Sequence, residues 1–241
     1  MRTFQGFRFE TLEDRRLLAI GPVNLAAGEG LTTYKFALAT TVEFTEAICS
    51  VSPSCTGSSS ESVKRSVASG ALDEIVSQIN TVFQSELAVQ LQLVPDNDLL
   101  ISTGSTSSDG YSDSNTSALT SENGPEIESR LAGTTGAGQT NEYDLAHVFA
   151  VGAGGGLATL GVIGQSTKAQ AASAVSSPVT LGQNNAVIAT SSFLGIVLHE
   201  IGHQFGAEHS FNGTVGNCSQ RAVESSYEPG SGSTIMSYGG V

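Results

Sequence analysis

The run His-Glu-Ile-Gly-His-Gln-Phe-Gly-Ala-Glu-His at residues 199–209 constrains this chain more than any other feature. On a helix, His199 and His203 lie one turn apart on one face, which suits two ligands of a tetrahedral Zn²⁺. Gly206 can end the helix in a left-handed conformation, so that the chain turns and His209 supplies a third ligand. Three protein nitrogens leave a fourth position open for water, which is typical of a catalytic site. Glu200, next to the first ligand, can reach that water without binding the metal.

The full pattern is far more specific than its core. A bare H-E-x-x-H arises by chance in roughly a few per cent of chains of this length, and the added glycine and third histidine lower this to roughly one in ten thousand. The surrounding segment, Ile188 to Gly206, is apolar on nearly every side, as a helix in a domain centre is. We therefore expect a buried helix here, and histidines that ligate a metal rather than only satisfy hydrogen bonds.

A second element lies downstream, where Met236 is the only methionine besides Met1. The pattern H-E-x-x-H-x-x-G-x-x-H followed by a methionine-bearing turn resembles the signature of the metzincin zinc peptidases. The stretches 228–238, 209–213 and 143–149 are similar to the bacterial reprolysin-like branch, and the likeness covers roughly residues 33–240. It implies that Met236 forms a hydrophobic floor beneath the metal without binding it.

The resemblance implies the zincin-like α/β (α+β) fold of the metzincins, a twisted, mostly parallel sheet over a central zinc-binding helix with a small, truncated C-terminal lobe. The order of elements agrees, and 241 residues suffice for one domain with a real core. We expect strands at 33–44, 89–94 and 144–151, helices at 63–87 and 125–131, and a polar loop over 103–120. Residues 1–30 would be a leader-like segment outside the fold, and 31–241 the catalytic domain, with an upper lobe to about 206 and a lower lobe over 207–241.

These residues predict a zinc-dependent endopeptidase with one catalytic Zn²⁺, in which zinc-activated water attacks the peptide bond and Glu200 is the general base. Tyr238 stands where some metzincins carry a tyrosine that touches zinc and stabilises the oxyanion; the alternative is a tyrosine that only packs. By resemblance, residues 157–165 supply an edge strand that binds a protein or peptide substrate in extended form. The preceding glycines, 152–156, do not complete a nucleotide-binding pattern, because Leu157 replaces its third glycine.

Two other functions stay open. A catalytically inert or truncated secreted module would bind zinc without cleaving peptides; the intact Glu200 argues against it, and the end of the chain at Val241 argues for it. A hydrolase of another bond, such as an amide in a cell-wall peptide, would use the same water chemistry.

Charge and patterning bound the partners and the location. A net charge of −13 argues against nucleic acid or an anionic membrane as partner and favours neutral or basic substrate segments. The sequence contains no run of 18 apolar residues, so it predicts no membrane-spanning helix. Residues 1–20 lack the apolar core of an ordinary secretory signal, but Leu12 to Ala19 is similar to a leader motif, L-E-x-R-x-L-L, of large exported bacterial proteins. The alternative is an amphipathic helix or a disordered arm. We expect a secreted or cell-surface protein of bacterial type.

The three cysteines give a further expectation. Cys49 and Cys55 flank a short proline-containing loop that a disulfide could close in an oxidising compartment. Cys218 is then left alone. In the resembled family a cysteine commonly follows the tyrosine of the methionine turn, and the chain stops just before that position, which implies the shortened C-terminal lobe. Cys218 as a metal ligand is the weaker alternative.

Other polar residues are weaker candidates. Asp109, Asp113 and Asn115 could bind Ca²⁺, but their spacing is not that of an EF-hand loop, and a solvated polar loop is favoured. His147 falls in a buried strand, where a packed or hydrogen-bonded core histidine is favoured over a ligand.

Overall fold

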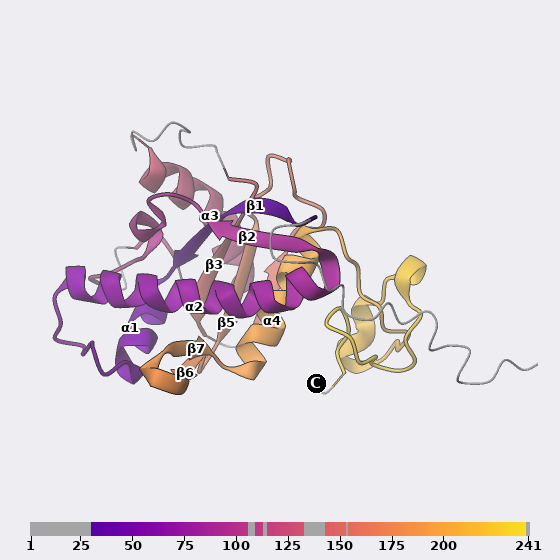
Figure 1. Cartoon of the computed structure of the whole chain (residues 1–241). Coiled ribbons are helices and arrows are strands. Elements are labelled where there is room, and N and C mark those ends of the chain that lie inside the picture. Colours follow the sequence, from indigo (N-terminus) through magenta and orange to yellow (C-terminus); the bar gives the residue numbers. More distant parts are fainter. Residues whose placement is uncertain (1–29, 106–108, 113–114, 133–142, 153, 240–241) are drawn as a thin grey trace, which may run out of the picture.

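The computed structural model describes residues 30–105, 109–112, 115–132, 143–152 and 154–239. They form a mixed α/β fold around one sheet, with helices on both of its faces (Figure 1). The sheet has five strands in the order β2-β1-β3-β5-β4, namely β2 (Val89–Leu93), β1 (Thr32–Thr40), β3 (Leu145–Val151), β5 (Ala171–Val175) and β4 (Gly155–Ala158). The first four are parallel, and β4 pairs antiparallel with β5 at the edge. The expected zincin-like α/β fold with a mostly parallel sheet is confirmed.

The two faces of the sheet differ in side-chain size. Large side chains such as Phe36, Leu38 and Phe149 point to one face, where α1 (Val42–Val51), α2 (Glu61–Leu87) and α4 (Ser191–Gln204) cover them. Alanines such as Ala37 and Ala172 alternate with them and point to the other face, against α3 (Thr116–Leu131). Strands that are buried on both faces are characteristic of parallel sheets between helical layers.

The helices begin at polar caps. The side chains of Thr41, Ser60, Asn115 and Thr190 accept a hydrogen bond from a backbone N–H in the first turn of α1, α2, α3 and α4, respectively. The long helix α2 crosses the molecule in Figure 1. A disulfide joins Cys49, in the last turn of α1, to Cys55 in the loop that follows. No described helix is both long and apolar enough to span a membrane.

Shorter elements complete the fold. A hairpin of β6 (Val179–Leu181) and β7 (Val187–Ala189), with the 3₁₀ turn η3 (Gln183–Asn185), precedes α4, and η2 (Asn97–Leu100) follows β2. After α4 the chain enters a lobe whose described residues, up to Gly239, form only the 3₁₀ turns η4 (Gly216–Gln220) and η5 (Val223–Ser225) and an isolated bridge between Phe211 and Glu228. This lobe lies beyond one end of α4 (Figure 1).

Several expected boundaries differ from those of the structure. The first strand ends at Thr40, because Thr41 caps α1 instead of continuing the strand. Helix α3 begins at Thr116 inside the expected loop, and it carries Pro125 in its interior. Helix α4 begins only at Ser191, because residues 187–189 pair with β6. The edge strand covers 155–158, so the expected span of 157–165 is displaced.

Candidate metal centre

The candidate metal ligands come from the last turns of α4 and the turn that follows. His199 and His203 lie on the helix, and Gly206 ends it with a φ of 94°, a conformation that favours glycine. The N–H of Gly206 donates to the carbonyl of His203 at 2.8 Å, and the N–H of Ala207 donates to Gly202 at 3.0 Å. Closed in this way, the chain reverses and carries His209 back toward the helix.

The three imidazoles converge through their Nε2 atoms. Nε2 of His209 lies 3.3 Å from Nε2 of His199 and 3.2 Å from Nε2 of His203. His199 is buried, while His203 and His209 are half-buried. One ligand atom from each residue lies within 4.8 Å of the other two, so the three histidines are placed to hold a metal ion.

The opposite ring nitrogens identify the chemistry of this set. Nδ1 of His199 lies 2.6 Å from the carbonyl oxygen of Ile235, Nδ1 of His203 lies 2.7 Å from that of Ala207, and Nδ1 of His209 lies 2.9 Å from that of Gln220. A carbonyl oxygen only accepts, so each Nδ1 carries the proton and each neutral ring turns a lone pair at Nε2 toward the other two. Three converging lone pairs repel one another unless a cation lies between them, and the residues therefore fit Zn²⁺.

Burial tunes the acid–base groups of the site. It is the main cause that lowers the pKa of His199 to about 4, and it also lowers the pKa of His203, which keeps both rings neutral and able to ligate. Burial raises the pKa of Glu200 to about 8 in the metal-free protein. A cation held by the neighbouring histidines would favour the ionised carboxylate and lower that pKa.

The methionine turn lies directly against the helix. A Cβ atom on Gly202 would lie only 2.5 Å from the sulfur of Met236, so the close approach requires glycine there. The N–H of Ser210 donates to the carbonyl of Met236 at 2.9 Å, which ties the segment after His209 to the same turn. Met236 thus packs against the helix turn that carries His199 and His203.

Tyr238, two residues after Met236, contacts the histidine cluster through its hydroxyl. Its hydroxyl lies 3.1 Å from Nε2 of His209 and 3.5 Å from Oε1 of Gln220. Burial first, and then the charge of Glu200, raises the pKa of Tyr238, so the phenol remains a protonated donor at neutral pH.

An open cleft runs past these groups. Its lining includes the three histidines, Glu200 and Tyr238, together with residues of β4 and of the segment that follows α4. Strand β4 forms one wall, and its hydrogen-bonding edge away from β5 has no partner strand among the described residues. Gly156 approaches Glu200 so closely that a Cβ atom would lie 2.3 Å from Cγ of Glu200. The edge strand and the candidate base therefore share one cleft.

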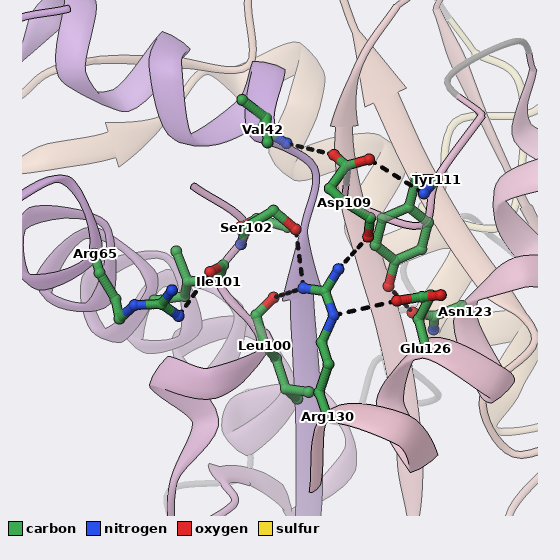
Figure 2. Close-up of polar contacts among 11 residues, drawn as sticks. Val42, Arg65, Leu100, Ile101, Ser102, Asp109, Tyr111, Asn123, Glu126 and Arg130 are labelled. Atoms are coloured by element: carbon green, nitrogen blue, oxygen red, sulfur yellow. Dashed lines mark hydrogen bonds and ion pairs between the residues drawn. The ribbon is translucent and has the colours of Figure 1, made fainter. Parts of the chain in front are cut away.

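The calcium candidates are engaged elsewhere. Asp109 accepts the N–H groups of Val42 at 2.9 Å and Tyr111 at 3.2 Å, and Asn115 caps α3. Figure 2 shows Arg130 of α3 holding the same segment through Leu100, Ser102 and the backbone of Asp109. Asp113 lies outside the described residues. The described oxygens of this set thus serve the backbone, which favours a structural role.

The other candidates, His147 and Cys218, do not line the cleft. His147 is fully buried, with Nδ1 3.2 Å from Oε1 of Gln204 and Nε2 2.9 Å from Oγ of Ser173. Cys218 is buried and has no disulfide partner among the described residues. Neither joins the histidine cluster, whose described members are the three histidines alone.

Three residues at or behind the site carry roles that the sequence does not announce. Gln204 anchors the end of α4 to β3 by donating to the carbonyl of Ala146 at 2.8 Å. Gln220 supplies the carbonyl that orients His209, and Glu228 holds the methionine turn. The last two lie in a lobe with little regular structure, where no periodicity marks a residue as buried or paired.

Comparison with known proteins agrees with this geometry. A search of curated proteins finds no match to the chain. The model of metallo-peptidase family M12B, reprolysin-like, matches residues 33–241, which include the whole histidine site and the methionine turn. With a match over most of its length, the chain belongs to the reprolysin-like metallopeptidases of family M12B.

Proposed function

We propose that this metallopeptidase is a zinc-dependent endopeptidase that uses Glu200 as its general base. The observation that carries the proposal is the convergence of three neutral imidazoles on one point beside Glu200, in an open cleft. A Zn²⁺ ion held by His199, His203 and His209 supplies Lewis-acid chemistry, polarising a carbonyl and lowering the pKa of a water molecule.

The side chains then divide the proton transfers. Glu200 takes a proton from the attacking water as the water oxygen bonds to the carbonyl carbon, and it returns that proton to the amide nitrogen as the C–N bond breaks. A carboxyl group whose pKa burial has moved toward neutrality is suited to both steps. Tyr238 donates its hydroxyl proton in a hydrogen bond to the oxyanion, a role supported by its place beside His209.

Strand β4 is the proposed binding site for the substrate backbone. An extended peptide that pairs with its free edge would pass Glu200 and the histidines, and backbone pairing tolerates many sequences. Gly156 allows this approach because it leaves room for the carboxylate of Glu200.

We also infer that the protein is exported. The inference is supported by the leader-like residues 12–19, which lie outside the described residues, and by the Cys49–Cys55 disulfide, a bond that persists in oxidising compartments.

Metal removal and return test the proposed function. The purified protein should cleave casein, lose that activity on treatment with a zinc chelator, and regain it with one equivalent of Zn²⁺. Zinc uptake without cleavage of casein or gelatin would favour the inert module. Hydrolysis of cell-wall peptide fragments in preference to casein would favour the other hydrolase.

A further inference from the structure

Glu228 is a buried carboxylate in a lobe that has almost no regular structure. Its side chain is 8% exposed, and it lies outside the cleft lining. Oε2 accepts hydrogen bonds from the N–H of Ser233 at 2.6 Å and the N–H of Thr234 at 3.1 Å. Oε1 accepts from the hydroxyls of Ser210 and Thr234. Both oxygens are therefore saturated by donors from two separate segments.

Those two segments each control part of the histidine site. Ser210 directly follows His209, and its backbone pairs with that of Glu228 at 2.9 Å. Ser233 and Thr234 begin the turn whose next residue, Ile235, supplies the carbonyl that accepts the Nδ1 proton of His199. The carboxylate thus joins the segment that carries His209 to the segment whose carbonyl orients His199.

The turn is shaped around this carboxylate. Gly232 adopts a φ of 72°, and a Cβ atom there would lie 3.0 Å from Oε2 of Glu228 and 2.5 Å from Cβ of Ser237. Burial acts to raise the pKa of Glu228, but the hydrogen bonds from Ser210, Thr234 and Ser233 outweigh it and hold the pKa at about 2. The carboxylate is therefore ionised at neutral pH. Its two oxygens accept hydrogen bonds from all of these N–H and hydroxyl donors, which a neutral side chain could not do.

We propose that Glu228 is a positioning residue of the metal site, which fixes His209 relative to His199 and thereby sets metal affinity without touching the metal. The proposal rests on the proposed binding of Zn²⁺ by the three histidines, but not on peptide cleavage. Partners behind a ligand shell typically change metal affinity by about 10- to 100-fold when they are removed.

The test compares Glu228→Gln and Glu228→Ala with wild type. Glu224→Gln is the matched control, because Glu224 is an exposed carboxylate in the same lobe. In Glu228→Gln the amide oxygen can still accept the two backbone N–H groups, but the amide nitrogen must face hydroxyls that now have to accept. We expect zinc affinity, measured by competition with a chromophoric chelator, to fall about tenfold in Glu228→Gln and about a hundredfold in Glu228→Ala. Glu224→Gln should stay within about twofold of wild type.

A second readout separates positioning from general support of the fold. The visible absorption of Co²⁺ at saturation reports the number and geometry of its ligands, and a displaced His209 should weaken and shift the bands in folded Glu228→Gln. A merely structural carboxylate would lower the melting temperature and leave the saturated Co²⁺ spectrum of the folded protein unchanged.

The outcomes are distinct. An unchanged Co²⁺ spectrum together with zinc affinity within about threefold of wild type in Glu228→Gln overturns the positioning role and leaves the proposed function standing. If Glu228→Ala does not fold, Glu228→Gln decides. Wild-type protein that binds zinc but cleaves nothing ends the peptidase proposal alone, and wild-type protein that binds no zinc overturns both.

Discussion

At the residue scale, the site depends on side chains that the sequence identifies and on backbone carbonyls that it cannot identify. The spacing of His199, His203 and His209 identifies their imidazoles as candidate metal ligands, because this pattern seldom arises by chance. The three carbonyls that accept their Nδ1 protons belong to Ile235, Ala207 and Gln220. Every residue has a carbonyl, so only the folded chain shows which three face the rings. Neutral imidazoles with Nε2 turned inward follow from those contacts.

The contact between Gly156 and Glu200 gives a test of the proposed role of Glu200 as general base. A methyl group at residue 156 would lie 2.3 Å from Cγ of Glu200 and must displace that side chain. Gly156→Ala should therefore lower kcat by at least about tenfold while zinc affinity stays near wild type. Gly152→Ala is the control, because its added methyl group meets Cβ of Ala174 at an ordinary 3.9 Å. Equal kcat values for the two variants would show that the position of Glu200 does not limit the reaction.

Tyr238 offers a second test at this scale. Its hydroxyl lies 3.1 Å from Nε2 of His209, close enough to serve a substrate oxyanion once a metal is bound. Tyr238→Phe removes one hydrogen-bond donor and should lower kcat by about tenfold to a hundredfold with little change in KM. Steady-state kinetics on one fluorogenic peptide measure both constants. An unchanged kcat would mean that the tyrosine only packs.

At the element scale, the sequence succeeds where one pattern dominates and fails where two elements adjoin. The period-two run of β2 and the apolar stripe of α2 are found where expected. The boundary between β7 and α4 is missed, because both are apolar and only Thr190 separates them. Strand β5, Ala171–Val175, is missed because alanine and serine carry little strand signal; its small side chains let α3 and α4 pack closely on both faces.

His147 of β3, which is buried and contacts Gln204 of α4, predicts how the stability of the fold depends on pH. Burial lowers the pKa of His147 from 6.5 to about 4. Below pH 6.5 the unfolded chain takes up a proton that the folded chain refuses, so stability falls as the pH drops from 6.5 toward 4. This shift amounts to on the order of 3 kcal/mol. His147→Gln should reduce the slope of unfolding free energy against pH in that range, measured by urea unfolding of metal-free protein, and the lowered pKa values of His199 and His203 should account for the slope that remains. Parallel plots for variant and wild type would rule out His147 as the cause.

At the scale of the whole molecule, the sequence predicts the architecture of the sheet and central helix but not that of the lobe after Gly206. The resemblance of the histidine run predicts the sheet over a central helix, and the family match confirms that architecture. The lobe after Gly206 could not be built from the sequence, because hydrogen bonds rather than a periodic apolar pattern hold it. The contacts of Ser210 and Glu228 are examples of such bonds, since they join residues 18 positions apart.

The net charge of −13 predicts a preference for positively charged peptide substrates. The charged residues that line the cleft beside the histidines are Glu200 and Glu208, and no lysine or arginine is among the described lining residues. A peptide flanked by lysines should therefore show a kcat/KM about tenfold above that of its glutamate-flanked counterpart at low salt, and the ratio should shrink as salt screens the charges. Glu208→Gln should reduce the same ratio. Equal cleavage of both peptides at low ionic strength would contradict the electrostatic preference.

The most direct test of the central claim compares casein cleavage by wild type and Glu200→Ala at matched zinc content. The claim is that Glu200 moves the proton while the three histidines hold the metal. Cleavage should fall by at least about a hundredfold in Glu200→Ala while zinc content and folding stay at the wild-type level. Equal cleavage by both proteins would contradict the claim, because the reaction would then proceed without its proposed base.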